Sequence, residues 1–522
     1  MTSADPTTAE PLLPATRPTL YDGWIMRVSA DPRLTRLWRW FAPTIITIVA
    51  GILRVWNLSS PHELVFDETF YVKDAWSQWN LGYASTWPKD ADDRFEAGET
   101  DIFTGVGSFV VHPPLGKFLI GAGMALFGAD SSFGWRIATA VFGTALVLLL
   151  YVVAKTLTNS VPFAAVASGL MAIDGLAIVL SRVALLDVFL AFFVLLAFWF
   201  VLLDRGTHVA RLDAAIHART ADGGPPSWGP VLWNRPWIIA AGAAVGAASA
   251  VKWSGLYVAI ALGVYLVVTD ALARRRAGVL LWPADAVRQG IATFVLFIPI
   301  AFALYLASWT TWLTTNGGWG RHALTESVGG LWSWVPLPLQ NLWTYHQAIY
   351  GFHVGLTKPH GYASPAWQWP LLTRPTSMFF HRDGSAVQNI YSMPNPFIWW
   401  GAVAAVIYLV WRFIVSRDWR YALVLTGVAA TYIPWLLYPA RTIFQFYTIA
   451  ILPFMLLALA FALRDLAGRR AKDDYRRRTG QHLVWLYLGF VVALSIFWYP
   501  ILTAVPVPDW FYQMHNWLPG WV

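Results

Sequence analysis

Long apolar runs recur along the 522-residue chain and alternate with charged or polar loops. A membrane-spanning helix needs roughly 20 apolar residues, and most of these runs come close to that length. The pattern predicts about eleven spanning helices, at residues 41–58, 133–154, 161–179, 184–203, 236–251, 254–272, 289–308, 396–415, 420–438, 443–463 and 482–504. The expected fold class is therefore an all-α, polytopic membrane protein.

Basic side chains gather in alternate loops between the apolar runs, at Arg205, Arg211, Arg219, Arg274, Arg275, Arg276, Arg288, Arg412, Arg417, Arg420 and within 464–478. Cytoplasmic loops of membrane proteins carry an excess of such residues. The distribution predicts a multi-pass protein of the cell membrane, with its N-terminus in the cytoplasm and its C-terminus outside. Residues 1–40 begin with a polar, Pro- and Thr-rich stretch, so we expect a disordered cytoplasmic tail there.

Two long loops fall on the external side of this predicted topology. Loop 59–132 is rich in acidic residues, and loop 309–395 is dense in Trp, His, Pro and Asn. Long loops in compact proteins are usually functional. The first belongs to an N-terminal transmembrane module, 41–308, as its candidate catalytic loop. The second separates that module from the C-terminal helices at 396–522. The apolar stretch 118–127 is too short to cross a bilayer and is expected to lie in the interface.

Composition narrows the possible chemistry. The chain contains no cysteine, which excludes disulfides, thiolate nucleophiles and Cys-ligated zinc. The net charge of +8 comes mainly from the loops, and the basic segment 464–478 has no interleaved aromatic pattern, so no nucleic-acid partner is expected. Many of the 32 Trp residues should mark the membrane interfaces. Others can form platforms for sugar rings.

Two adjacent carboxylates, Asp67 and Glu68, open the first outer loop within an apolar and aromatic frame, 65–71. A carboxylate held at a membrane interface is partly desolvated, which raises its pKa and makes it a stronger base. Such a base can take the proton of an acceptor hydroxyl during glycosyl transfer, and the second acid can orient the acceptor. The alternative is a solvated acidic pair at the N-terminus of a helix.

Several cations are predicted at the outer ends of helices, together with one more acid: Lys117, Arg136, Arg182, Lys252, Arg441 and Asp187. Cations that surround one cavity suit a phosphate leaving group, because they neutralise its charge as the sugar departs. Contact with lipid headgroups remains the alternative for each of them.

The remaining polar candidates are expected to contact an acceptor or a sugar, by hydrogen bonding or stacking: His112, His346, His353, His360 and Trp369. Histidines also bind metals, but Asp and Glu are sparse in the second outer loop and no paired His spacing stands out there. No metal is therefore expected.

The order of several short motifs resembles the protein O-mannosyltransferases, and most closely their bacterial, actinobacterial-type branch. These motifs are Phe66-Asp67-Glu68, His112-Pro113-Pro114-Leu115-Gly116-Lys117, Ser181-Arg182 with Leu185-Leu186-Asp187, Val251-Lys252-Trp253-Ser254-Gly255-Leu256, Gly355-Leu356-Thr357, His360, Trp369-Pro370-Leu371 and Arg374-Pro375. Each motif alone is weak, whereas their order and spacing over nearly the whole chain are specific.

The resemblance implies a GT-C glycosyltransferase fold. It implies transfer of mannose, with inversion, from polyprenyl-phosphate mannose to Ser or Thr of secreted proteins. Asp67 is similar to the family's catalytic base and Glu68 to its acceptor-positioning partner. Arg136 matches a family arginine, and Arg182, Asp187 and Lys252 match positions on the donor side.

The chain departs from the eukaryotic members of the family in two places. Val110 stands where many of them carry an acid, and loop 309–395 is too short for their β-trefoil module. Acceptor selection must then depend on the loops or on a secretion partner such as the translocon. Residue chemistry leaves other functions open: a GT-C enzyme with a lipid or cell-wall glycan acceptor, a transporter, which could use an intramembrane Asp174, and a structural subunit.

Overall fold

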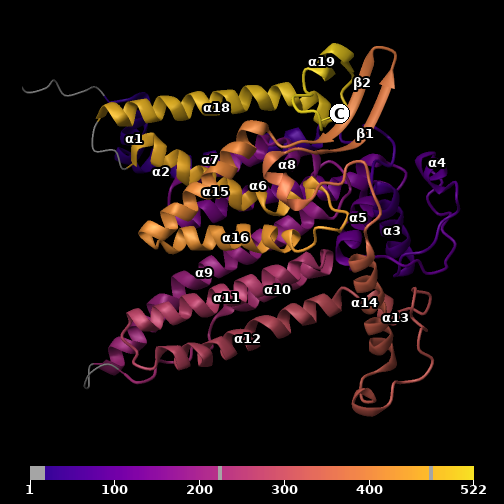
Figure 1. Cartoon of the computed structure of the whole chain (residues 1–522), viewed down its shortest axis with the longest axis horizontal. Helices are drawn as coiled ribbons and strands as arrows, with labels where there is room; N and C mark the ends of the chain where they lie inside the picture. Colours follow the sequence, from indigo (N-terminus) through magenta and orange to yellow (C-terminus); the bar gives the residue numbers. More distant parts are fainter. Residues whose placement is uncertain (1–17, 221–225, 470–473, 522) are drawn as a thin grey trace, which may run out of the picture.

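The computed structural model describes residues 18–220, 226–469 and 474–521 as a bundle of long helices capped at one end by shorter elements (Figure 1). The first half contains α1 (Leu20–Ala30), α2 (Pro32–Val55), α3 (Glu68–Leu81), α4 (Ala91–Glu96), α5 (Leu115–Phe127), α6 (Ser132–Thr158), α7 (Val161–Ile173), α8 (Gly175–Val179), α9 (Asp187–Thr220), α10 (Pro236–Val251), α11 (Ser254–Arg276), α12 (Trp282–Ala307) and α13 (Thr310–Thr314).

The second half contains η1 (Gly330–Trp332), α14 (Leu337–Gly355), η2 (Ala366–Leu371), β1 (Thr376–Asp383), β2 (Ala386–Ser392), α15 (Pro396–Ser416), α16 (Trp419–Leu436), η3 (Gln445–Ala450), α17 (Leu452–Arg464), the π-helical turn η4 (Asp465–Arg469), α18 (Asp474–Leu502), β3 (Val507–Pro508) and α19 (Asp509–Gln513). The chain is thus predominantly helical, as expected. One small antiparallel sheet, in the order β1-β2-β3, is an addition to that expectation.

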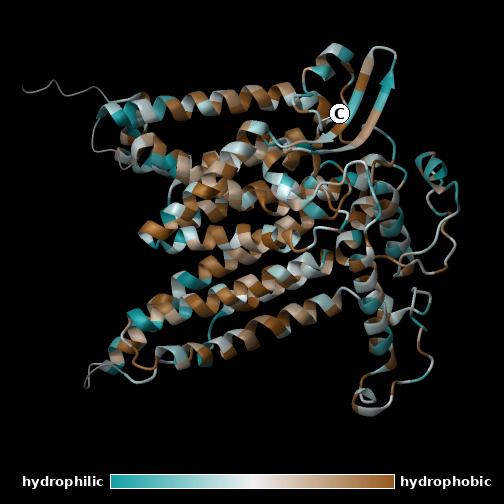
Figure 2. Cartoon of the chain, viewed as in Figure 1, coloured by the Kyte–Doolittle hydropathy of each residue, from teal (hydrophilic) through white to brown (hydrophobic). Residues whose placement is uncertain are grey.

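Seven helices within the described residues are long and apolar enough to cross a membrane: α2, α6, α9, α11, α12, α15 and α18. Figure 2 shows hydrophobic residues along the long helices and hydrophilic residues at their ends. The other predicted segments are also helical, but α7, α10 and α17 are shorter. A multi-pass membrane protein is therefore confirmed, whereas the count of eleven spans stays a prediction.

Asp174 interrupts one of the predicted spans between α7 and α8. Its Oδ1 accepts a hydrogen bond from the backbone N–H of Ala177 at 3.1 Å, and its Oδ2 accepts one from the N–H of Asn395, also at 3.1 Å. An aspartate at this position satisfies N–H groups that a helix start leaves without partners. Capping therefore accounts for the intramembrane acid that a transporter could have used.

The two long loops lie together at one end of the bundle. The elements α3, α4 and α5 of the first loop and α13, α14, β1 and β2 of the second all lie at the right of Figure 1. The predicted short helix at 118–127 is part of α5. Gly116 lets α5 lie close to the bundle, because a Cβ there would come within 2.8 Å of Leu186 Cδ2. The loop that precedes α5 is thereby held against the start of α9.

The prediction of a disordered tail over residues 1–40 is wrong for its second half. Residues 20–30 and 32–40 are helical, whereas residues 1–17 lie outside the described part of the chain. Asp31 caps α2 through a hydrogen bond from Arg33 N. The indole rings of Trp24 and Trp38 meet edge to face at 5.1 Å and join α1 to α2. Local capping and aromatic packing therefore outweigh the polar composition.

Candidate active site

Asp67 lies immediately before α3, and its carboxylate makes no capping hydrogen bond to the helix. The preceding residue, Phe66, has a left-handed backbone (φ 52°), and its ring packs edge-on against Phe444 and Phe446. Asp67 itself occupies the N-cap position. Among the described residues, no side-chain hydrogen bond or ion pair to Asp67 is found. A carboxylate without partners keeps its lone pairs available for a substrate proton.

The surroundings of Asp67 suit a base that works near neutral pH. Burial raises the pKa of Asp67 to about 6, the nearby Lys252 ammonium opposes that rise, and the Asp187 carboxylate adds to it. A group with this pKa is mainly ionised at pH 7 and still binds a proton readily. Asp67, Lys252 and Asp187 come from three different segments, so the tertiary fold creates this environment.

Lys252 and Asp187 form an ion pair beside Asp67. Lys252 Nζ lies 2.9 Å from Asp187 Oδ1 and 2.8 Å from Oδ2. Asp187 is the first residue of α9, and Lys252 follows the last residue of α10 in an extended conformation. The ammonium also lies 5.1 Å from the centre of the Tyr447 ring, within reach of a cation–π interaction. Both partners are largely buried, which strengthens their field on neighbouring groups.

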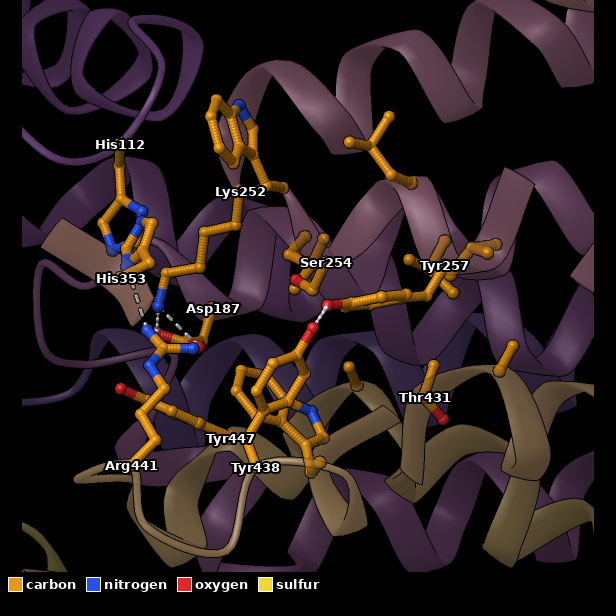
Figure 3. Close-up of a pocket in the computed structure, with 18 of the residues that line it drawn as sticks. His112, Asp187, Lys252, Ser254, Tyr257, His353, Thr431, Tyr438, Arg441 and Tyr447 are labelled. Atoms are coloured by element: carbon orange, nitrogen blue, oxygen red, sulfur yellow. Dashed lines mark hydrogen bonds and ion pairs between the residues drawn. The ribbon is translucent and has the colours of Figure 1, made fainter. Parts of the chain in front are cut away.

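A second cation, Arg441, lies near Lys252 and contacts one of two neighbouring histidines (Figure 3). Arg441 Nη2 donates to His353 Nδ1 at 3.0 Å, and His353 Nε2 donates to the carbonyl of Val111 at 2.9 Å. The His353 ring lies 5.3 Å from that of His112. Burial, with help from the neighbouring cations, lowers the pKa of His353 to about 4 and that of His112 well below its usual value. Both imidazoles are therefore neutral at pH 7.

These side chains line one cavity of about 320 Å³. Its polar end is formed by His112, Asp187, Lys252, His353 and Arg441. The rest of its lining is mainly apolar and aromatic, with side chains from α9, α11, α14, α16 and the turn after α16: Leu190, Val194, Leu256, Tyr257, Val258, Tyr350, Val354, Ala430, Trp435 and Tyr438. One end therefore suits an anion and the other suits a hydrocarbon chain.

Glu68 and Arg136 do not face this cavity, which corrects their predicted contacts with acceptor and phosphate. Both side chains are fully buried, and Arg136 Nε and Nη2 each lie 2.8 Å from a different Glu68 oxygen. Glu68 also accepts from the N–H of Ala184 at 2.7 Å and of Val65 at 3.0 Å. Arg136 uses its remaining donors on backbone carbonyls. The pair joins the start of α3 to α6.

Arg182 is also engaged by the fold rather than directed at the cavity. Its guanidinium donates to the carbonyls of Arg54, Trp56 and Asn57 at 3.0, 2.6 and 3.1 Å. These carbonyls lie at the end of α2, where helix geometry leaves acceptors without partners. The predicted phosphate contact from Arg182 is therefore not supported.

Lys117 lies behind the cavity wall. Its Nζ donates to the carbonyl of His112 at 3.2 Å and lies 3.9 Å from an oxygen of Asp74. Burial lowers the pKa of Lys117 to about 8, and the Asp74 carboxylate opposes that shift. Lys117 positions the His112 segment and does not line the cavity.

The remaining predicted contacts lie elsewhere. His346 Nε2 and the Tyr305 hydroxyl are 2.6 Å apart, outside the cavity lining. His360 packs edge-on against Phe66 and does not line the cavity. Trp369 is buried and donates to the carbonyl of Ser364 at 2.8 Å, so its ring is not available as a sugar platform.

Sequence reasoning missed the tyrosines around Asp67. Tyr71 is buried and interacts electrostatically with Asp67 and Asp187, and Tyr447 does the same from η3. Tyr71 follows Asp67 by four residues, a spacing that places both on one face of a helix. That spacing was a usable signal for Tyr71. Tyr447 gave no such signal, because only the tertiary fold brings η3 to this place.

No cluster of three or more His, Asp or Glu side chains arranged to hold a metal is found in residues 18–220, 226–469 and 474–521. The absence of a metal from the reaction stays a prediction.

Comparison with known proteins identifies the family. Residues 338–521 match the sequence model of the C-terminal four TMM region of protein-O-mannosyltransferase, and residues 93–206 match that of dolichyl-phosphate-mannose-protein mannosyltransferase. A polyprenol-phosphate-mannose–protein mannosyltransferase of Mycobacterium tuberculosis (strain ATCC 25618 / H37Rv) is 33% identical, over 98% of this chain and 97% of the relative. The chain belongs to the protein O-mannosyltransferase family. It is therefore a mannosyltransferase, as the motifs predicted.

Other relatives of this mannosyltransferase agree. The identically named protein of Corynebacterium glutamicum is 30% identical, over 91% of this chain and 92% of its own. Among solved structures, the Saccharomyces cerevisiae Pmt1–Pmt2 complex bound to the sugar donor matches with a TM-score of 0.68 and 15% identity, over 92% of both chains. The apo oligosaccharyltransferase of Archaeoglobus fulgidus matches with a TM-score of 0.51 and 14% identity, over 93% of this chain and 58% of its own. The expected GT-C fold is confirmed.

Proposed function

We propose that this mannosyltransferase transfers mannose from polyprenyl-phosphate mannose to Ser or Thr hydroxyls of secreted proteins, with inversion at the anomeric carbon. The names of its mycobacterial and corynebacterial relatives support this donor and a protein acceptor. The observation that carries the proposal is the position of Asp67, an unpaired carboxylate with a pKa of about 6, beside the polar end of the cavity. Asp67 acts as the base.

The donor fits the cavity with its phosphate at the polar end. Lys252 and Arg441 supply two cations there, and the neutral His112 ring can donate or accept a hydrogen bond. Both ring nitrogens of His353 are used by Arg441 and by the Val111 carbonyl, so His353 orients the Arg441 guanidinium. The first isoprene units of the donor extend into the apolar end between α9, α11 and α16. Arg441 and Lys252 keep their predicted phosphate contact, whereas Asp187 acts by holding the Lys252 ammonium in place.

The reaction is a single displacement. Asp67 takes the proton of the acceptor hydroxyl while the hydroxyl oxygen forms a bond to the anomeric carbon. The bond from that carbon to the phosphate oxygen breaks on the opposite side, and its electron pair leaves with polyprenyl phosphate. Lys252 and Arg441 stabilise the charge that develops on the leaving phosphate. Attack from the side opposite the leaving group inverts the configuration.

We assign the site to the outer face of the cell membrane. The basic loops of the sequence flank the opposite end of the bundle, because α9 begins at Asp187 beside the cavity and runs away from it to Arg205 and beyond. The positive-inside rule puts that far end, and the N-terminus, in the cytoplasm. Acceptor chains then reach Asp67 past the two outer loops. The secretion translocon is the expected source of these acceptor chains.

Transfer measured with membranes tests the proposal. Wild type and Asp67→Asn are supplied with polyprenyl-phosphate mannose and a Ser/Thr/Pro-rich peptide, and mannosylated peptide is quantified. Loss of a positioned base costs about 10²–10⁴-fold in rate, so Asp67→Asn should lose nearly all transfer while it inserts normally. Asp93→Asn is the matched control, since Asp93 is an exposed carboxylate of the same loop. Equal turnover by Asp67→Asn and wild type would remove the base assignment.

A further inference from the structure

A long stretch of the second outer loop carries no formal charge. From Ser327 to Thr357 the sequence contains no Asp, Glu, Lys or Arg. This segment, called the arm below, includes η1 and all of α14. About a quarter of the residues in soluble domains are charged, so an uncharged segment of this length is unusual for a surface that faces water.

The arm exposes large apolar and aromatic side chains at its tip. Leu331 is 90% exposed, Trp332 65% and Trp334 78%. The outward face of α14 continues this surface with Trp343, Tyr350 and Val354, each more than half exposed. Their spacing of seven and four residues puts them on one side of the helix.

The inner face of α14 is also mainly apolar after its first turn, where Gln340 and Asn341 are buried. Leu342, Tyr345 and Ile349 are buried against the end of α12 and the first outer loop. The Tyr345 hydroxyl contacts the backbone N–H and carbonyl of Val110, both at 3.0 Å. A helix that is apolar on all sides is normally surrounded by protein or by lipid. Protein covers only one side of α14.

The direction of α14 fits a membrane surface. In Figure 1 it runs across the long helices, at the end where α12 finishes. His346 of α14 lies 2.6 Å from the hydroxyl of Tyr305, in the last turn of α12. Because α12 is long and apolar enough to cross the membrane, its end marks the depth at which lipid meets water. Helices that lie in this plane present aromatic and aliphatic side chains to the headgroup boundary.

We propose that the arm lies in the membrane interface. Leu331, Trp332 and Trp334 insert among the lipids, and the outward face of α14 contacts the lipid surface. The occupant of this surface is the lipid leaflet at the loop end of the bundle. Lipid fits better than a protein partner because the exposed side chains continue the apolar surface of α12, where Phe302 is also exposed. A surface made for an acidic or basic partner would carry charge, and the arm carries none.

The arm also sets the position of the catalytic cavity. Tyr350 and Val354 line the cavity together with Leu256 and Tyr257 of α11, and both are more than half exposed. His353 of the same helix faces the polar end. If the proposed donor site is correct, an arm held in the interface keeps the apolar mouth of the cavity open to the leaflet that supplies the donor lipid.

Depth measurement in nanodiscs tests the arm without any assay of transfer. Because the chain has no cysteine, Ser333→Cys introduces a single labelling site between the two exposed tryptophans. A nitroxide there should collide far more often with oxygen, which concentrates in lipid, than with a water-soluble nickel complex. Ser385→Cys, exposed in the β1–β2 turn at the same end of the bundle, is the matched control and should show the opposite preference.

Each outcome decides the proposal. A label at 333 that reacts to the nickel complex as strongly as the label at 385 would show that the arm faces water, and would overturn it. A label shielded from both reagents would show that a protein, such as a second copy of the chain, covers the arm, and would also overturn it. Adding Trp332→Ser and Trp334→Ser to Ser333→Cys should lower the ratio of oxygen collisions to nickel collisions at the 333 label several-fold. The same two substitutions should leave this ratio unchanged for a label at position 385.

Discussion

Two neighbouring residues of identical charge have different surroundings in this enzyme. Asp67 and Glu68 adjoin at the start of α3, and the helix turns their side chains in different directions. Glu68 accepts four short hydrogen bonds inside the protein, two of them from Arg136. Asp67 accepts none from the described residues. A saturated carboxylate cannot take a proton from a substrate without losing bonds, so only Asp67 is suited to act as a base.

The rate of transfer should depend on the ionisation of Asp67. Its pKa is raised to about 6 and its active form is the carboxylate, so kcat/KM should rise with pH through about 6 and level off above it. Lys252 stabilises the carboxylate and lowers this pKa. Lys252→Gln should therefore move the rising limb to higher pH, in addition to slowing the reaction.

Asp187→Asn provides the opposite charge change at the same ion pair. Asp187 raises the pKa of Asp67, so this variant should move the limb to lower pH. Full pH–rate profiles of both variants check the prediction. A limb that stays in place in both would show that another group controls the rate.

At the scale of elements, the buried Glu68–Arg136 pair determines where α3 begins. Arg136 lies on α6, and its Nη1 and Nη2 donate to the carbonyls of Pro61 and Glu63, each at 2.8 Å. The chain between α2 and α3 is therefore fixed at several points around one guanidinium. Asp67 takes its position from this arrangement, so we propose that Arg136 positions the base of the proposed reaction.

Removal of Arg136 should destabilise the fold strongly. Loss of one partner from a buried ion pair leaves an uncompensated charge and costs about 3–5 kcal/mol. Arg136→Gln should therefore unfold at a clearly lower temperature in detergent. Lys73→Gln, which breaks the partly exposed pair between Lys73 and Asp92, should cost about 0–1 kcal/mol. Similar melting temperatures for these two variants would contradict the conclusion that the buried Arg136–Glu68 pair stabilises the fold.

At the scale of the whole molecule, the bundle separates its chemistry from its basic loops. The cavity and both long loops lie at one end (Figure 1). Arg205 of α9, Arg276 at the end of α11 and Arg417 just after α15 lie together toward the other end. A lipid donor and a protein acceptor can meet at the cavity end, because one arrives from the leaflet and the other from water.

Cysteine labelling of intact cells tests the predicted orientation. The natural chain has no cysteine, so each labelled site is unambiguous. Asp93→Cys, in the first outer loop, should react with a membrane-impermeant maleimide added outside. Arg276→Cys, at the end of α11, should react only after the membrane is permeabilised. Labelling of position 276 alone in intact cells would place the cavity on the cytoplasmic side and refute the proposed acceptor route.

The order of residues was enough to predict the helices, the two long outer loops, the family and the candidate base. Apolar length and loop charge are local properties, so they can be read from the order of residues. It also found His112, Asp187, Lys252, His353 and Arg441, which line the cavity. It could not separate these from Arg136 and Arg182, since an arginine near a helix end looks the same whether it meets a phosphate or a backbone carbonyl.

Which charges remain available to a substrate depends on how the helices and loops pack. Arg136 is satisfied by Glu68 from a distant segment, and Lys252 meets Asp187 across two helices. Tyr447 reaches the same place from η3. Whether a polar side chain is free depends on which acceptors the fold brings within hydrogen-bonding distance, and that distance is a property of the packed bundle and not of any stretch of sequence.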